Sequence, residues 1–289
     1  MFISIAQILF LGSALGVTLS PDMKNKQTNT ALTSGKVTGM YANPSQYKFM
    51  AQIFYLPNVN SNESFLACNG VLVSNNYILT TGGCLSDGGD DLKKENLRVI
   101  VGKVNLGESS GPQERYSVSE ILYYEGVKTP NADVALLKLA NSIPAAAATP
   151  VKLLNCPIQQ GQDVILSGFG ALDSSMNEPS RKLVHTNVDL ARTANCAIYG
   201  RNWRHNDGTQ ICTESLTGND SCQGDTGAPL LVYKSGELIV AGLVSYGINS
   251  NPKNKDLCGI NGLTFYSNLN YFMGWIKRVV GEKTLKFGC

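Results

Sequence analysis

The sequence predicts a β-rich protein whose short strands fold back on one another as a barrel or a sandwich. From residue 37 onward, short runs of Val, Ile, Leu and Tyr alternate with clusters of Gly, Asn, Asp and Ser. The chain of 289 residues contains 29 Gly and 11 Pro, which interrupt any long apolar segment. This spacing is typical of antiparallel sheets and argues against strands that alternate with helices.

The expected strands follow one another at short intervals and are rich in β-branched and aliphatic residues, which suit pleated, half-buried surfaces. Examples are Gly70–Val73, Tyr77–Thr80, Leu97–Val101, Asp133–Leu139, Val164–Ser167, Leu183–Leu190, Pro229–Tyr233 and Leu238–Val244. Near the end, Asn268–Val280 carries apolar residues at helical intervals and predicts one amphipathic helix. The sequence shows no internal repeat and no long linker, so we expect one compact body with two similar halves.

The N-terminal region indicates secretion. Phe2–Val17 is apolar and uncharged, too short for a typical membrane span, and it contains the small residues Ala14 and Gly16. We expect residues 1–16 to be a signal peptide and the polar residues 17–36 to be a pro-segment. A buried or anchoring helix is the alternative for the apolar run. After removal of the signal we expect no membrane span and an extracellular location.

The charge and cysteine content exclude several function classes. Lys and Arg number 24 against 22 Asp and Glu, a net charge of +2, and they are scattered, so nothing favours binding to nucleic acid. The eight cysteines are even in number and include no Cys-x-x-Cys pair, which favours disulfides over a zinc site. We expect no metal and no cofactor.

Two polar segments give weaker indications of a glycosylation site and of a calcium site. Asn62 begins a glycosylation sequon in a polar loop, whereas the sequon at Asn219 lies inside a motif described below and is expected to be too enclosed. Asp87, Asp90 and Asp91 cluster within residues 86–95. A solvated acidic loop is preferred there over a calcium site, because the spacing of calcium ligands is not matched.

Several motifs occur in one order along the chain. Residues 220–230 are Asp-Ser-Cys-Gln-Gly-Asp-Thr-Gly-Ala-Pro-Leu, residues 79–84 are Leu-Thr-Thr-Gly-Gly-Cys, and residues 131–139 are Asn-Ala-Asp-Val-Ala-Leu-Leu-Lys-Leu. Together these segments resemble the serine, histidine and aspartate segments of trypsin-like serine proteases. The resemblance implies two six-stranded antiparallel β-barrels with a C-terminal helix, over residues 37–281, followed by a tail at residues 282–289.

The chain departs from that family at two of three catalytic positions. Gly83 stands at the histidine position and Thr226 at the serine position, whereas Asp133 is kept. A hydroxyl nucleophile needs an adjacent base, and glycine offers no side chain. The resemblance also implies an oxyanion hole formed by the backbone N–H groups of Gly224 and Thr226. Loss of a triad member lowers turnover by about 10⁴- to 10⁶-fold.

The resemblance assigns further residues to a specificity pocket and an activation site. Asp220 matches the acid at the base of a pocket for Lys or Arg, and the pocket walls match Ser221, Ser245, Gly247 and Gly262. Cleavage after Lys36 would free Val37, whose ammonium would pair with Asp225 in the family manner. The alternatives are a vestigial pocket and a Lys36 that is only a basic loop residue.

The cysteine pairs are also implied by the resemblance. Cys68–Cys84, Cys196–Cys212 and Cys222–Cys258 match family bridges, and parity leaves Cys156 with Cys289. A fourth family bridge is replaced by Val164 and Val232, which predicts an apolar contact.

Only two histidines are present, His185 and His205. Both are expected far from Gly83, because the first lies in a strand after the linker between the barrels and the second in the Cys196–Cys212 loop. A general base must lie within about 3 Å of its proton. Neither histidine is therefore expected to replace the missing imidazole.

Two function classes follow. The first is a secreted, non-catalytic homologue that binds a host hydrolase or protease; short segments resemble glucanase inhibitor proteins of plant-infecting microbes. The alternative is a trypsin-like endopeptidase with residual or substrate-assisted cleavage after Lys or Arg. A secreted domain without a retained binding role is a third option.

Overall fold

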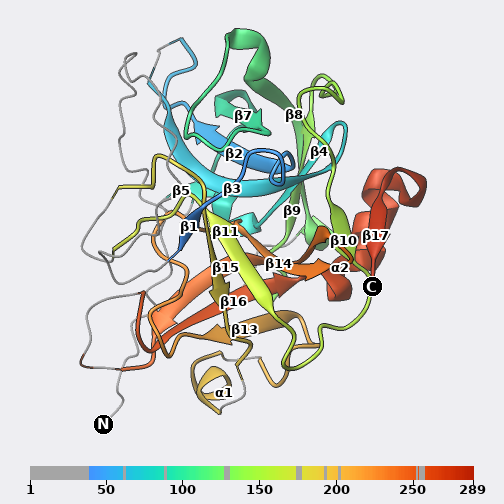
Figure 1. The fold of residues 1–289 in the computed structure, drawn as a ribbon. Helices are drawn as coiled ribbons and strands as arrows, with labels where there is room; N and C mark the ends of the chain where they lie inside the picture. Colours follow the sequence, from blue (N-terminus) through green and yellow to red (C-terminus); the bar gives the residue numbers. More distant parts are fainter. Residues whose placement is uncertain are drawn as a thin grey trace.

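The computed structural model describes residues 39–60, 63–87, 90–126, 131–173, 178–191, 194–200, 203–251, 253 and 258–289. The predicted signal peptide and pro-segment, together with Lys36, Val37 and Asn62, lie outside the described residues. In Figure 1 the first half of the chain forms one β-structure and the second half another, stacked one above the other. The C-terminal helix lies beside both halves.

The first half is a closed six-stranded barrel. Its strands follow the order β2-β3-β4-β9-β8-β7 around the ring. Their bounds are β2 Met50–Tyr55, β3 Phe65–Ser74, β4 Tyr77–Thr80, β7 Leu97–Val101, β8 Tyr116–Tyr123 and β9 Ala135–Leu139. The predictions for β4 and β7 are confirmed at both ends. The short hairpin of β5 (Ser86–Asp87) and β6 (Asp90–Asp91) lies outside this barrel.

The second half is a nine-stranded sheet with the main order β1-β12-β11-β14-β15-β10-β17, to which β16 and β13 are joined beside β15. The bounds are β1 Met40–Tyr41, β10 Lys152–Leu154, β11 Val164–Gly168, β12 Val184–Val188, β13 Gln210–Glu214, β14 Pro229–Lys234, β15 Glu237–Asn249, β16 Gly262–Asn268 and β17 Lys286–Gly288. Three of these strands, β1, β10 and β17, are only two or three residues long.

The six longer strands of this sheet close into the expected second barrel. A single antiparallel bridge joins Leu190, just beyond β12, to Thr213 in β13. Backbone hydrogen bonds from Ala191 N to Cys212 O (3.0 Å) and from Glu214 N to Asp189 O (3.0 Å) extend the closure. The predicted architecture of two antiparallel barrels is therefore confirmed, although the second barrel closes through a far shorter ladder than the first.

The predicted C-terminal helix is confirmed as α2 (Leu269–Ile276), which continues into a π-helical turn, η5 (Lys277–Gly281), and a 3-10 turn, η6 (Glu282–Thr284). The Asn268 side chain caps its first turn by accepting from Asn270 N at 3.1 Å. The tail then forms β17, which pairs in parallel with β10. The other short helices are α1 Asn195–Tyr199, η1 Gly82–Leu85, η2 Lys94–Asn96, η3 Pro112–Glu114 and η4 Tyr124–Gly126. Among the described residues, none of the helices is long and apolar enough to cross a membrane.

All eight cysteines form the predicted pairs. The bridges are Cys68–Cys84, Cys196–Cys212, Cys222–Cys258 and Cys156–Cys289. The last bridge ties the C-terminal tail to the segment that follows β10. Val164 and Val232 are buried partners in the β11–β14 ladder, which confirms the apolar contact expected in place of the fourth family bridge.

Candidate active site

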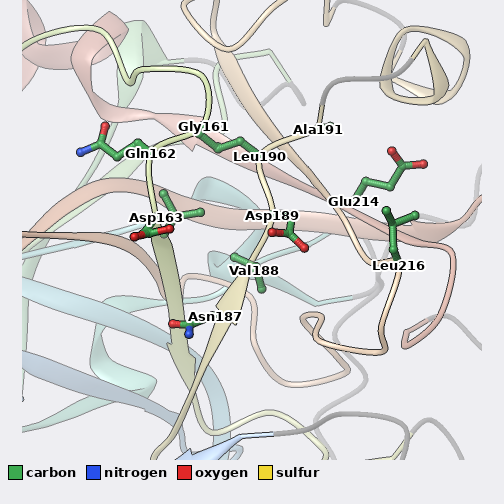
Figure 2. A pocket seen from close by; sticks show the side chains of 11 residues that line it. Gly161, Gln162, Asp163, Asn187, Val188, Asp189, Leu190, Ala191, Glu214 and Leu216 are labelled. Atoms are coloured by element: carbon green, nitrogen blue, oxygen red, sulfur yellow. The ribbon is translucent and has the colours of Figure 1, made fainter.

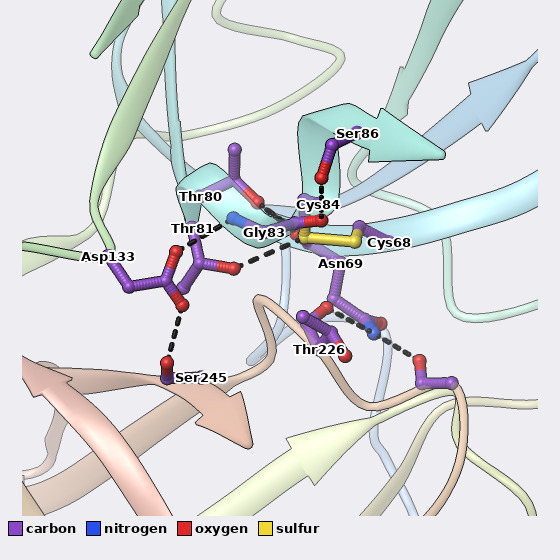
Figure 3. The surroundings of a disulfide bond; sticks show 11 residues. Cys68, Asn69, Thr80, Thr81, Gly83, Cys84, Ser86, Asp133, Thr226 and Ser245 are labelled. Atoms are coloured by element: carbon purple, nitrogen blue, oxygen red, sulfur yellow. Dashed lines mark hydrogen bonds between the residues drawn. A yellow bond between two sulfur atoms is a disulfide. The ribbon is translucent and has the colours of Figure 1, made fainter. Parts of the chain in front are cut away.

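Gly83 lies on the exposed edge of η1, directly after β4, and faces Asp133 (Figure 3). Its backbone N–H donates to Asp133 Oδ1 at 2.7 Å. A Cβ at Gly83 would meet only the Asp133 oxygens within 4 Å, at 3.6 and 3.7 Å, which are ordinary contact distances. The position predicted as the vacant histidine site is therefore open and has room for a side chain.

Asp133 is held from several sides although no imidazole faces it. Only 8% of the residue is exposed, and the Ser245 hydroxyl donates to its Oδ2. The Ser267 hydroxyl donates to the Asp133 backbone carbonyl. Burial raises the pKa of the Asp133 carboxyl, while the hydrogen bonds from Ser245 and from the backbone of Gly83 oppose that rise. The carboxylate is thus positioned by the fold, independently of a catalytic partner.

The backbone of Thr226 is fixed, whereas its hydroxyl is not engaged. Asn69 N donates to the Thr226 carbonyl at 2.9 Å, and the Asn69 amide reaches the same oxygen at 3.3 Å. Within the described part of the chain, the Thr226 hydroxyl has no hydrogen-bond partner and faces no base. The geometry therefore presents a hydroxyl at the serine position without a group that could remove its proton.

The two predicted donors of the oxyanion hole, the N–H groups of Gly224 and Thr226, lie on one loop. Gly224 adopts a φ of 89°, a left-handed conformation that favours glycine. Among the described residues, nothing accepts a hydrogen bond from the N–H of Gly224 or Thr226. Two unpaired donors on one loop are the arrangement that stabilises a developing negative charge.

Asn69 was not predicted as a site residue, yet it joins the two barrels at this loop (Figure 3). It is fully buried, and its amide donates to the Gly224 carbonyl at 2.7 Å. Its Oδ1 accepts from Phe169 N at 3.3 Å. Its one signal in the sequence was a polar residue inside the apolar run of β3, because buried polar groups require partners.

Asp225 is buried and accepts from two backbone N–H groups. Gly170 N lies 2.8 Å from Oδ1 and Cys222 N lies 2.9 Å from Oδ2. Burial raises the pKa of Asp225 to about 6. A Cβ at Gly170 would lie 2.3 Å from this carboxyl, so the close approach requires glycine. The predicted partner, Val37, lies outside the described residues, so the ion pair stays a prediction.

The carboxyl of Asp220 is engaged by its own chain. The Thr264 hydroxyl donates to Oδ1 at 2.7 Å, Ser221 N to Oδ1 at 2.9 Å and Gly259 N to Oδ2 at 3.1 Å. Only 4% of Asp220 is exposed, and burial raises its pKa to about 7. Gly262, expected as a pocket wall, lies so close that a Cβ there would be 1.8 Å from Oδ2.

Thr264 is a second residue that sequence analysis missed. It is fully buried in β16, opposite Gly247 of β15, and its hydroxyl also lies 2.7 Å from Ser221 Oγ. Ser245, predicted as a further wall residue, instead directs its hydroxyl to Asp133. The predicted pocket residues other than Ser245 are thus gathered around Asp220. The Asp220 carboxyl, however, already accepts its hydrogen bonds from groups of this chain.

Neither histidine contacts this centre. His185 lies in β12 and stacks on Tyr47 with ring centroids 5.7 Å apart, and burial lowers its pKa. His205 is exposed and contacts Asp207. Their locations agree with the prediction that neither replaces the missing imidazole. Within the described residues, no group of three or more His, Cys, Asp or Glu side chains could hold a metal ion.

A family model described as trypsin matches residues 36–276. The chain belongs to the trypsin family. Among curated relatives, trypsin-1 of Astacus astacus is 29% identical over 221 residues, which is 74% of this chain and 88% of the relative. Human kallikrein-8 is 29% identical over 227 residues, 75% of this chain and 78% of the relative.

A third relative is longer than this chain. Tissue-type plasminogen activator of Sus scrofa is 23% identical over 255 residues, which cover 83% of this chain and 43% of the relative. The predicted membership is confirmed by these matches together with the barrels. They place Gly83 and Thr226 inside the matched region of the trypsin family model.

Proposed function

We propose that this protein is a secreted, non-catalytic member of the trypsin family that acts by binding another protein. The observation that carries the proposal is the open position at Gly83, where a Cβ would meet only Asp133 within 4 Å. Without an imidazole the Thr226 hydroxyl has no base, and removal of a triad member costs about 10⁴-fold or more in turnover.

The proposed partner is a secreted host hydrolase, with an endoglucanase as the first candidate. Support comes from the resemblance of short segments to glucanase inhibitor proteins. The four disulfides fit an oxidising, extracellular compartment, where such a partner would be met. A glycan at Asn62 and a role in virulence belong to the same proposal.

The second candidate is a trypsin-like endopeptidase with residual or substrate-assisted activity. It is favoured by the unpaired N–H groups of Gly224 and Thr226, which could still stabilise an oxyanion. Against cleavage after Lys or Arg stands Asp220, because only 4% of the residue is exposed and its carboxyl accepts a hydrogen bond from Thr264. We therefore rank this candidate second.

One experiment separates the two candidates. The purified chain is mixed with a secreted plant endoglucanase at equal concentration, and hydrolysis of carboxymethyl cellulose is measured beside the intact mass of both proteins. Loss of cellulose hydrolysis, with both masses unchanged and a 1:1 complex on size exclusion, supports the binding function. Loss accompanied by fragments that end in Lys or Arg supports the peptidase instead.

A further inference from the structure

A groove on the second barrel lies apart from the residues of the candidate active site. It has a volume of about 720 Å³ and is formed where β11 begins and where β12 and β13 end (Figure 2). Val188 and Leu190 contribute apolar lining, and Leu216, which is 67% exposed, stands at its edge. The volume suits a side chain or a short peptide segment, and the lining combines apolar side chains with polar and acidic ones.

Two carboxylates face this groove from neighbouring strands. Val164 pairs with Val188 in the β11–β12 ladder, so Asp163 and Asp189 stand one residue beyond that pair, at the same end (Figure 2). Both residues are exposed, and within the described chain neither carboxylate makes a hydrogen bond or an ion pair. Like charges on opposed strand positions are destabilising unless a cation lies between them.

A third carboxylate is fixed in the same wall. Glu214 is only 8% exposed, and its Oε1 accepts from Asn195 Nδ2 at 2.6 Å. Its backbone N–H donates to the Asp189 carbonyl, which ties β13 to the strand that bears Asp189. Two other exposed carboxylates, Glu237 and Glu282, form ion pairs with Lys152 and Lys277. The groove thus combines a negative rim with an apolar lining.

We propose that this groove binds a Lys- or Arg-containing segment of a partner protein. The cationic head lies between Asp163 and Asp189, and a neighbouring apolar side chain packs against Leu216. A guanidinium suits the site best, because its planar fork can bond two carboxylates at once. The inference rests on the proposed function, since it gives the binding role a location, but the groove is separate from Gly83 and Thr226.

The test uses the full chain and a fluorescein-labelled hexapeptide of alternating Arg and Leu. A peptide with citrulline in place of Arg keeps the shape and removes the charge. Binding is followed by fluorescence anisotropy for the natural chain and for the double variant Asp163→Asn with Asp189→Asn. The double variant Glu95→Gln with Glu120→Gln, on the first barrel, removes the same charge and serves as the matched control.

We expect the Arg peptide to bind the natural chain. The citrulline peptide should bind the natural chain at least about tenfold more weakly, and the Arg peptide should bind the Asp163→Asn, Asp189→Asn variant at least about tenfold more weakly. The control variant keeps the natural affinity, and Leu216→Ser weakens binding of both peptides. Equal loss in the control variant, or retained binding in the groove variant, overturns the inference. Loss of binding in the Asp220→Asn variant would assign the peptide to the predicted specificity pocket and would also overturn the inference.

Two further outcomes are informative about the occupant and the wider proposal. Peptide binding that arises only after cleavage at Lys36 would assign the groove to residues 17–36 of this chain instead of a partner. A chain that binds the peptide but hydrolyses proteins would retain the groove and contradict the proposed function. The two failures are therefore distinguishable.

Discussion

Gly83, on the first barrel, and Asp220, on the second, differ in how their neighbours are arranged. A Cβ at Gly83 would meet only Asp133 within 4 Å, at ordinary contact distance, whereas the carboxyl of Asp220 accepts hydrogen bonds from Thr264, Ser221 and Gly259. One position is open and the other is filled. The predicted histidine position is therefore open beside Asp133, whereas the predicted pocket acid, Asp220, is buried and hydrogen-bonded to its own chain.

The largest expected effect is at the open position. The double variant Gly83→His with Thr226→Ser restores both missing groups beside a carboxylate that is already held in place. We expect hydrolysis of p-nitrophenyl acetate to rise by at least about 10³-fold. Each single variant is the control and gains little, because nucleophile and base act as a unit. No gain in the folded double variant would show that Asp133 is not positioned for catalysis.

The enclosed Asp220 carboxyl predicts a smaller effect, on the binding of an amidinium ligand. Thr264→Gly removes the hydroxyl that donates to Asp220 Oδ1, so the carboxylate can meet an amidinium. We expect p-aminobenzamidine to bind at least about thirtyfold more tightly, as one charge-assisted contact permits. Thr264→Ser keeps the hydroxyl and serves as the control. Tight binding to the natural chain would mean that the pocket is open.

Asn69 and Gln52 form a matched pair that tests how the barrels are joined. Both are fully buried, and each side chain makes three hydrogen bonds to backbone groups. Only the bonds of Asn69 cross between the barrels. Replacing either by Ala should lower the free energy of unfolding by about 2 kcal/mol.

Hydrogen exchange then separates the two variants. Asn69→Ala should speed exchange at Phe169, whose N–H donates to the Asn69 side chain. Exchange should also speed at Asp225 and Gly227, the hydrogen-bonded amides of the loop at residues 224–227, and Gln52→Ala should change none of these. Equal exchange of this loop in both variants would contradict a joining role for Asn69.

The buried acids predict an unusual dependence of stability on pH. Burial raises the pKa of Asp220 to about 7 and that of Asp225 to about 6, from an ordinary value of 3.8. Between pH 4 and 7 the folded chain therefore binds more protons than the unfolded chain, so the free energy of unfolding falls as pH rises. The slope approaches about 1.4 kcal/mol per pH unit for each group.

Urea titrations from pH 4 to 8 measure this slope, and Asp220→Asn should reduce it. Cleavage after Lys36 sharpens the test, because a Val37 ammonium beside Asp225 would favour its charged form and remove that part of the slope. Stability that rises from pH 4 to pH 7 would contradict the assignment.

Local sequence patterns predicted part of the strand set: strands β2, β8, β13 and β16 are in the structure but not among the expected strands. β4 and β7 were predicted at both ends, and the Cys156–Cys289 bridge followed from parity within the resemblance. Asn69 and Thr264 were missed because their roles depend on contacts that sequence spacing does not reveal. Asn69 lies 155 residues before Gly224, and Thr264 lies 44 residues after Asp220.

The central claim is that the Thr226 hydroxyl is not activated. The most direct measurement is the intact mass of the chain after reaction with a fluorophosphonate probe, once cleavage after Lys36 has been verified by Val37 at the new N-terminus. The Gly83→His, Thr226→Ser variant is the positive control. We predict no adduct on the natural chain and a full adduct on the variant. A stoichiometric adduct at Thr226 of the natural chain would contradict the account.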